Sequence, residues 1–534
     1  MSQSPTLLPG ATIGIFGGGQ LGRLTAMAAR TMGYRIHVLD PDPGCPARFV
    51  VDQCVEAAWD DAREAARLAR GCDVITLEIE QISLASMNAA GSFAPVRPSE
   101  LMLGIIQDRI EQKNWLARNG FPVGPFRAVR SLDELREAIT VLGGKCFCKS
   151  ATGGYDGRGQ GKVGFRNTSE SPHSVPHSSQ LHRDEWDRAT NPDARHSEPQ
   201  RSAGSESPYL PPSSHESVPH SSRASLRDEW DRTTTITEDE LRGAWEALGQ
   251  GPGIVEQAIE LDREISILVA RSPRGEVKVY PAAWNHHEDQ ILAWSVIPAP
   301  LPEALAKEAR ELASSIADTF SLEGILAVEL FVTKDGRILV NELAPRPHNS
   351  YHASERACVT SQFEQLVRAV CNLPLGSPDV VQPCAIANLL GEVWLQPAEP
   401  QTTLPESPRT VPHSSRSDEW DRATTPTAVI PSEREARVEG PPHLPLSGHS
   451  SARHSEPQRS EGSESRYLPS SEVATAKPTP RAPHFDRALA VPGVRLHLYE
   501  KLRPRKGRKM GHLSAVGSTP EEAVELVLKA KSLL

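Results

Sequence analysis

The sequence predicts a multidomain protein of mixed α/β and α+β class, and three features of the chain lead to this expectation. Residues 11–78 alternate between apolar strands and amphipathic helices, which is the pattern of a parallel βαβαβ unit. A glycine-rich loop follows a short strand that ends at Lys149. Two apolar segments flank a tight turn at residues 334–336 and favour an antiparallel hairpin.

The first unit contains a glycine turn at the start of a helix. Its strands are expected at 11–16, 35–39 and 74–78, with helices from the turn to about residue 32 and at 61–70. The turn reads Gly17-x-Gly19-x-x-Gly22 with Asp40 about twenty residues on, which satisfies the dinucleotide-binding pattern. The same turn holds any phosphate or carboxylate at a helix N-terminus. Polar residues expected at the ligand-binding edge are Gln20, Glu78 and Glu80.

The loop after Lys149 is suited to closing over an anion. Residues 151–160 read Ala-Thr-Gly-Gly-Tyr-Asp-Gly-Arg-Gly-Gln, so the backbone can turn its N–H groups toward phosphate oxygens. No Gly-Lys-Ser/Thr ends the loop, which excludes a Walker-type phosphate loop. Tyr155, Asp156 and Arg158 carry chemistry that a hinge does not need. We expect a flexible cover over a nucleotide's phosphates, with an ordinary glycine-rich hairpin as the alternative.

Two glutamates in apolar strands form a candidate metal site. Residues 324–332 and 338–343 have the pattern of buried strands, so Glu329 and Glu342 can face each other with Asn341 beside them. Carboxylates are costly to bury unless they bind a cation, and Mg²⁺ takes carboxylates together with phosphate oxygens. The alternative is that both side chains point to solvent on an edge hairpin.

Further polar positions suggest the rest of a nucleotide site. The strand at 253–259 ends in polar groups suited to an adenine edge, and Glu264 follows within reach of a ribose. Arg346, His348 and Asn349 come directly after the proposed metal ligands and suggest a small anion near the γ-phosphate. Taken alone, His348 is more often a structural residue.

Composition and charge exclude several classes of partner. The 534 residues include 58 basic and 68 acidic side chains, a net charge of −10, which disfavours nucleic acid or a membrane surface. No apolar run approaches the roughly 18 residues of a membrane span, and no export signal is visible. The eight cysteines match neither a zinc knuckle nor a disulfide framework. We expect a cytoplasmic enzyme with reduced cysteines.

Two segments look unlike folded protein. Residues 168–234 and 397–482 are rich in Ser, Pro, His and Arg and repeat one another, as with Asp-Glu-Trp-Asp-Arg starting at 184, 228 and 418. Such segments cannot bury enough surface to offset their ordering entropy. We interpret them as low-complexity insertions, with partner binding by the repeated motif as the alternative. Removing both leaves a core of roughly 380 residues, enough for three domains.

The motifs together resemble the 5-(carboxyamino)imidazole ribonucleotide synthase family of ATP-grasp enzymes. The matching stretches, in order, are Gly-Gly-Gln-Leu-Gly-Arg, Thr-Gly-Gly-Tyr-Asp-Gly-Arg-Gly-Gln, Glu-Gln and Asn-Glu-Leu-Ala-Pro-Arg-Pro-His-Asn-Ser. The resemblance covers nearly all of the core and neither insertion. It implies an ATP-grasp fold with three domains: a Rossmann-like (pre-ATP-grasp) N-terminal domain at 1–105, an ATP-grasp domain at 106–375 and a small β-rich C-terminal domain at 376–534.

The resemblance also implies a reaction. ATP, bicarbonate and 5-aminoimidazole ribonucleotide would give ADP, phosphate and the N-carboxylated ribonucleotide through carboxyphosphate, in de novo purine (IMP) biosynthesis. Mg²⁺, with Mn²⁺ as the alternative, would neutralise charge on the transferring phosphoryl group. The implied partners are these small molecules, with neither nucleic acid nor membrane, and we expect a homodimer.

Residue roles follow by position from the resemblance. The ATP ligands would be Arg109, Lys149, Gly154, Tyr155, Asp156, Gly157, Arg158, Gly159, Gln160, Glu256, Gln257, Ala258, Ile259, Glu264, His287, Asn341 and Glu342. Glu329 and Glu342 would hold the metal. Catalytic roles would fall to Tyr155, Asp156, Arg158, Arg346, His348, Asn349 and Lys501, of which Arg346, His348 and Asn349 would position bicarbonate. The ribonucleotide would meet Gln20, Glu80, Lys501, Arg508 and Lys509, and the glycine-rich loop would close over it and exclude water.

Two positions depart from the family pattern. Residues 503–509 carry two residues more than the usual Arg-Pro-Gly-Arg-Lys, which leaves the register of Lys501 and Arg503 open. Tyr351 stands where glycine often precedes the histidine at 352.

Three other functions stay open at this point. A sister ATP-grasp ligase that uses another acyl phosphate, as in formate-dependent glycinamide ribonucleotide formylation, would share the ATP site but not the Tyr-Asp-Gly-Arg loop. An NAD-dependent oxidoreductase would explain the glycine turn but neither the Lys149 loop nor the paired glutamates. A non-catalytic scaffold would leave the filled polar positions without a role.

Overall fold

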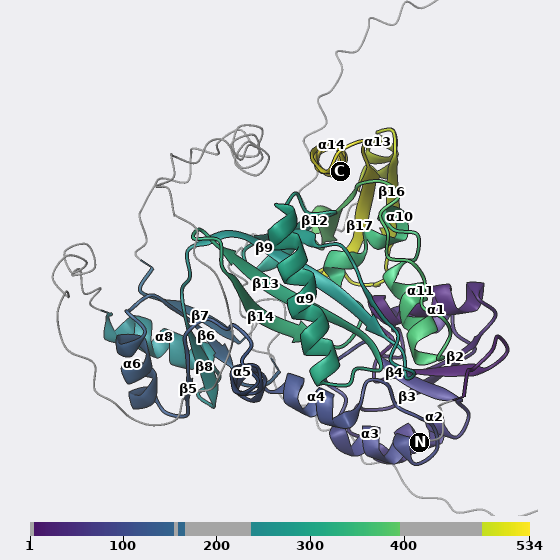
Figure 1. Ribbon diagram of the computed structural model, residues 1–534, viewed down its shortest axis with the longest axis horizontal. Helices are drawn as coiled ribbons and strands as arrows, with labels where there is room; N and C mark the ends of the chain where they lie inside the picture. Colours follow the sequence, from purple (N-terminus) through teal and green to yellow (C-terminus); the bar gives the residue numbers. More distant parts are fainter. Residues whose placement is uncertain (1–4, 154–158, 166–235, 396–482) are drawn as a thin grey trace, which may run out of the picture. The chain divides into compact units, whose positions relative to one another are not determined.

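The computed structural model describes residues 5–153, 159–165, 236–395 and 483–534 (Figure 1). Within these ranges the strands form three sheets. Residues 154–158 of the glycine-rich loop and both predicted insertions, at 168–234 and 397–482, lie outside the described residues. Among the described helices, none combines the length and apolar character that a bilayer crossing requires.

The first sheet is parallel, with strand order β3-β2-β1-β4. Its strands are β1 (Thr12–Phe16), β2 (Arg35–Asp40), β3 (Gln53–Glu56) and β4 (Val74–Leu77). Its helices are α1 (Gln20–Thr31), η1 (Pro46–Phe49), α2 (Ala62–Ala69), α3 (Leu84–Gly91) and α4 (Glu100–Gln107). The predicted βαβαβ unit is confirmed. Strand β3 was not predicted, because this edge strand has four residues of which only one is buried, and so it lacks an apolar pattern.

The second sheet is antiparallel, with strand order β5-β8-β6-β7. Its strands are β5 (Phe126–Val129), β6 (Cys146–Ser150), β7 (Gln160–Val163) and β8 (Gly253–Gln257), and its helices are α5 (Arg109–Arg118), α6 (Leu132–Val141) and α8 (Glu238–Ala247). Cys146 and Cys148 are buried among apolar side chains of α6, α8 and β8. Because side chains alternate along a strand, Lys149 lies on the opposite face of β6.

The third sheet has nine strands in the order β14-β13-β9-β11-β12-β15-β17-β16, with β10 beside β9. Its strands are β9 (Leu261–Arg271), β10 (Val277–Val279), β11 (Ala283–Glu288), β12 (Ile291–Ile297), β13 (Gly324–Thr333), β14 (Ile338–Ala344), β15 (Cys384–Leu390), β16 (Val494–Leu498) and β17 (Lys509–Val516). Its helices are α9 (Glu303–Thr319), η3 (Asn349–Tyr351), α10 (Ser354–Ala357), α11 (Gln362–Val370), α12 (Glu392–Leu395), α13 (Phe485–Leu489) and α14 (Pro520–Lys531). Since β12 pairs with β15, the C-terminal strands continue the central sheet across residue 375, and the predicted domain boundaries stay predictions.

One apolar core joins the first sheet to the third. Ile13 of β1 and Val38 of β2 belong to the same buried cluster as Leu268 of β9 and Val367 of α11. This packing places the carboxyl ends of the parallel strands close to the segment that follows β14. The active-site candidates of the two regions therefore meet in one place.

Candidate active site

A cavity of about 890 Å³ opens between the parallel sheet, the β13–β14 hairpin and the segment before β17. Its volume lies within the range of small-molecule sites. The predicted site residues that line it are Gln20, Glu78, Glu80, Arg109, Gln160, His287, Glu329, Glu342, Arg346, His348, Asn349, Lys501, Arg508 and Lys509. The fold therefore brings together positions that lie almost 500 residues apart in the chain.

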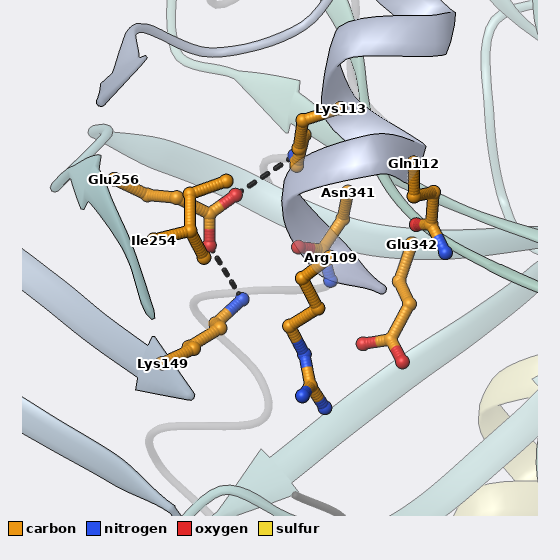
Figure 2. A pocket seen from close by; sticks show the side chains of 8 residues that line it. All are labelled: Arg109, Gln112, Lys113, Lys149, Ile254, Glu256, Asn341 and Glu342. Carbon is orange, nitrogen blue, oxygen red and sulfur yellow. Dashed lines mark ion pairs between the residues drawn. The ribbon is translucent and has the colours of Figure 1, made fainter. Parts of the chain in front are cut away.

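A smaller pocket lies beside it, between α5, β6, β8 and β14 (Figure 2). Asp108 accepts hydrogen bonds from the amides of Ile110 and Glu111 and so starts α5. Arg109 and Lys113 follow one helical turn apart on one face of α5, and both line this pocket.

Glu256 on β8 holds two lysines in this pocket. Its carboxylate oxygens lie 2.8 Å from Lys113 Nζ and 2.7 Å from Lys149 Nζ. Burial favours the neutral acid, but the two ammonium groups outweigh it and hold the pKa of Glu256 well below its usual range. Burial likewise opposes the charge on Lys149, yet Glu256 and Glu342 raise its pKa. Lys149 is therefore a fixed positive charge, as predicted, whereas Lys113 was missed because a helix lysine is ordinarily solvated.

The two glutamates predicted to bind metal lie opposite each other. Glu329 pairs with Glu342 in the antiparallel register of β13 and β14, and a bulge follows Glu329. Asn341 Nδ2 donates to Glu329 Oε2 at 3.2 Å, and His348 Nε2 lies 3.1 Å from Glu329 Oε1. Burial opposes ionisation of Glu329, but the contact with His348 prevails and lowers the pKa to about 2.

This donor set fits a hard divalent cation. Burial, and then the carboxylate of Glu329, raise the pKa of Glu342, so a cation between the two would stabilise both charges. Asn341 Oδ1 is buried without a hydrogen-bond partner among the described residues. Two carboxylates and an amide oxygen are ligands that Mg²⁺ accepts. The solvent-facing alternative for the hairpin was wrong, because both glutamates line the cavity.

Two ion pairs flank the paired glutamates. His287 Nδ1 lies 2.9 Å from Glu264 Oε2. Burial opposes protonation of His287, but the hydrogen bond and charge of Glu264 raise its pKa. On the other side, Arg346 Nε lies 3.0 Å from Glu80 Oε1. The predicted bicarbonate residue Arg346 thus lies beside the end of β4.

The C-terminal basic residues reach the cavity despite the two extra residues at 503–509. Lys501 Nζ donates to Gln20 Oε1 at 2.8 Å and to the Lys509 carbonyl at 2.7 Å. The loop between them closes on itself, since Arg508 donates to the Arg503 carbonyl. Lys501, Arg508 and Lys509 all lie on the cavity wall.

Several predicted residues lie elsewhere. Gln257, Ala258 and Ile259 line neither pocket, and the amides of Gln257 and Ala258 donate to the carbonyls of residues 125 and 145. Gly159 pairs with β6 through its carbonyl, which accepts from Ser150. Gly154, Tyr155, Asp156, Gly157 and Arg158 lie outside the described residues.

The glycine turn after β1 is occupied by the chain's own carboxylates. The amides of Gly19 and Gly22 donate to Glu78 at 2.7 and 3.2 Å, and the Gly18 amide donates to Asp40 at 2.7 Å. A dinucleotide would need these amides for its pyrophosphate and the acidic side chain for its ribose. The geometry therefore argues against the oxidoreductase alternative.

The contacts of Tyr351 give it a structural role at the position where the family pattern often has glycine. Its side chain is fully buried, and its hydroxyl accepts from the Leu268 amide and has the carbonyl oxygens of Ser266 and Pro281, at 2.8 and 2.9 Å, as alternative acceptors for its one proton. A tyrosine here fastens the segment after β14 to β9, which supports the position of His348 and Asn349.

Three features together define an ATP-grasp enzyme. Antiparallel sheets lie on either side of a nucleotide pocket, a strand that ends in a lysine precedes a glycine-rich loop, and a hairpin carries paired glutamates. Family models match accordingly: a ribonucleotide synthetase preATP-grasp domain at 10–107, an ATP-grasp domain at 232–363 and a phosphoribosylaminoimidazole carboxylase C-terminal domain at 473–526.

Curated relatives and solved structures agree with this class. The chain is 34% identical over 387 residues to the N5-carboxyaminoimidazole ribonucleotide synthase of Brucella melitensis, covering 72% of this chain and 88% of that protein. It is 33% identical over 396 residues to the Bacillus subtilis synthase, covering 74% and 85%. The crystal structure of an ADP complex of an N5-carboxyaminoimidazole ribonucleotide synthetase matches with a TM-score of 0.66 at 28% identity, over 99% of this chain and 98% of that one.

The chain belongs to the N5-carboxyaminoimidazole ribonucleotide synthase family. It is an ATP-dependent ligase with an ATP-grasp fold, an N-terminal preATP-grasp domain and a C-terminal domain of this family. The resemblance seen in the sequence motifs is confirmed.

Proposed function

We propose that this enzyme carboxylates the amine of 5-aminoimidazole ribonucleotide with bicarbonate, at the expense of ATP and through carboxyphosphate, in purine biosynthesis. One observation carries the proposal: a single cavity holds the paired glutamates, the Arg346-His348-Asn349 segment and the basic C-terminal residues. The paired glutamates suit the metal of a nucleoside triphosphate, the Arg346-His348-Asn349 segment suits a small planar anion, and the basic residues suit a phosphorylated substrate.

ATP would lie between the second and third sheets. Lys149 and Arg109 supply positive charge for its phosphates, and Glu256 holds Lys149 in place through a 2.7 Å ion pair. Glu329, Glu342 and the Asn341 amide oxygen would hold Mg²⁺, which neutralises charge on a transferring phosphoryl group. Gly154–Arg158 would cover the phosphates and exclude water.

Bicarbonate would bind beside the γ-phosphate, at Arg346, His348 and Asn349. A bicarbonate oxygen attacks the γ-phosphorus, the bond to the β-phosphate oxygen breaks, and ADP leaves. The guanidinium of Arg346 matches a planar anion through its fork of N–H donors. The product of this step, carboxyphosphate, is labile, so a closed cavity is needed.

The ribonucleotide would enter from the C-terminal side. Lys501, Arg508 and Lys509 line that wall and can meet its phosphate. Its amine attacks the carbon of carboxyphosphate or of the carbon dioxide that it releases, phosphate leaves, and the amine loses a proton. The orienting charges lower the barrier by holding the reactants together.

Oxygen transfer tests the proposed route. With ¹⁸O-labelled bicarbonate, one labelled oxygen should appear in each inorganic phosphate, because that oxygen bridges carbon and phosphorus in carboxyphosphate. Unlabelled phosphate during full turnover would contradict the route. Replacing bicarbonate with formate and the ribonucleotide with glycinamide ribonucleotide tests the sister-ligase alternative, and we expect no ADP release from that mixture.

A further inference from the structure

Glu78 occupies the N-terminus of α1 from inside the protein. It follows β4, is only 5% exposed, and accepts hydrogen bonds from the amides of Gly19 and Gly22. The cap residue of α1, Gly19, offers no side-chain hydrogen bond of its own. Glu78 therefore takes the place that a bound phosphate has in dinucleotide-binding proteins.

The glycines of this turn fit the glutamate. A Cβ on Gly19 would lie 2.6 Å from Glu78 Oε1, and a Cβ on Gly17 would lie 2.8 Å from Glu78 Cγ. Both distances are too short for real atoms. The turn is free of side chains so that the carboxylate can approach the helix.

Gln20, the first residue of α1, connects two parts of the cavity. Its Nε2 donates to Asn349 Oδ1 at 2.6 Å, and its Oε1 accepts from Lys501 Nζ at 2.8 Å. Asn349 belongs to the segment assigned to bicarbonate, and Lys501 belongs to the wall assigned to the ribonucleotide. Because both ends of the amide are engaged, the position of Gln20 sets the separation of these two groups.

We propose that Glu78 is a positioning residue for the carboxylation: it caps α1 and, through Gln20, holds Asn349 and Lys501 on either side of the place where bicarbonate meets the amine. The inference rests on the proposed function and adds to it a residue that lines the cavity and acts on the reactants through Gln20. Holding two reactants in position in this way raises the reaction rate strongly, since a displacement of about 1 Å can lower the rate by on the order of a hundredfold.

The test uses the KM values of the three substrates. Glu78→Gln keeps the volume of the side chain but offers one acceptor oxygen instead of two. We expect the KM for 5-aminoimidazole ribonucleotide and for bicarbonate to rise by on the order of tenfold, with the KM for ATP changed by less than about twofold. The nucleotide pocket is built from α5, β6, β8 and β14, and Glu78 is not among the described residues that line it.

A matched control separates positioning from stability. Asp61 caps α2 in the same sheet region by accepting from the amides of Arg63 and Glu64, and it does not line the cavity. Asp61→Ala should lower the melting temperature and leave all three KM values unchanged. If Glu78→Gln does not fold, Glu78→Asp, which keeps the charge but withdraws it by one methylene, takes its place with the same expected KM pattern.

A double-mutant cycle completes the test. Gln20→Met removes both hydrogen bonds of the amide, and Glu78→Gln with Gln20→Met should raise the ribonucleotide KM no further than the larger single effect. Fully additive effects, unchanged KM values, or an equal rise in the KM for ATP would overturn the inference. A wild-type enzyme without turnover of bicarbonate and ribonucleotide would instead overturn the proposed function.

Discussion

Glu329 on β13 lies directly opposite Glu342 on β14, so two carboxylates lie side by side at the edge of the cavity. Replacing either by glutamine should lower ADP release by on the order of a hundredfold or more, because a divalent cation contributes several kcal/mol to phosphoryl transfer. Initial rates at a series of Mg²⁺ concentrations are the measurement, and the metal concentration for half-maximal rate should rise.

A control exists on the same hairpin. Asp335 lies in the turn between the two strands and pairs with Arg337 at the exposed surface. Asp335→Asn removes the same charge and should leave the Mg²⁺ dependence unchanged. Equal behaviour of Asp335→Asn and Glu329→Gln would show that general charge, and not the paired site, is responsible.

The ion pairs of Glu256 predict a stability effect. Glu256→Gln leaves Lys113 and Lys149 without their buried counter-charge, so the free energy of unfolding should fall by on the order of 3–5 kcal/mol at neutral pH. Denaturant unfolding measures this change. A loss no larger than that of the exposed pair variant Asp335→Asn would contradict the role given to Glu256.

The same pairs predict the direction of a pH effect. The folded-state pKa of Glu256 is depressed, so its stabilising contribution is fully present above the unfolded value of about 4.3 and is lost as the pH falls. The difference in unfolding free energy between wild type and Glu256→Gln should therefore narrow between pH 6 and pH 3. A difference that widens in acid would be inconsistent with this sign.

Arg346 predicts a bicarbonate effect. Arg346→Lys should raise the KM for bicarbonate about tenfold, equivalent to ~1.4 kcal/mol, because a lysine offers a point charge in place of a planar fork. Steady-state rates in carbon-dioxide-depleted buffer measure it. Arg337→Lys, at an exposed ion pair in the turn between β13 and β14, is the control and should behave as wild type.

The first insertion predicts a deletion that is tolerated. β7 and α8 flank it in the chain and pack together, since a Cβ on Gly161 would lie 3.2 Å from Ala244 Cα. Deleting residues 168–234 and joining the ends with a short linker should keep the maximal rate within about twofold, because loop length costs little closure entropy. A deletion variant that folds but does not turn over ATP would refute this expectation.

Local patterns were sufficient to predict much of the site. The strand limits around Glu329 and Glu342 followed from apolar runs and a Lys-Asp-Gly turn, and the register then placed the two side chains opposite each other. Lys149 was predicted from its place at a strand end before the glycine-rich loop. Such features depend on residues close together in the sequence, where periodicity and turn preference act.

Long-range contacts were not predictable in the same way. The pairing of Lys113 with Glu256 joins residues 143 positions apart, and the capture of the glycine turn by Glu78 depends on the register of β1 and β4. The glycine pattern alone suggested a dinucleotide, because a phosphate and a buried carboxylate make the same demand on a helix N-terminus. Only the packing of the parallel sheet shows that the group at the N-terminus of α1 is the carboxyl group of Glu78 and not a phosphate.

The most direct test of the account is ADP release with substrates omitted one at a time. We predict rapid release with ATP, Mg²⁺, bicarbonate and 5-aminoimidazole ribonucleotide together, and strongly reduced release when either bicarbonate or the ribonucleotide is left out. Release at the full rate without bicarbonate, or no release from the complete mixture, would contradict the assignment.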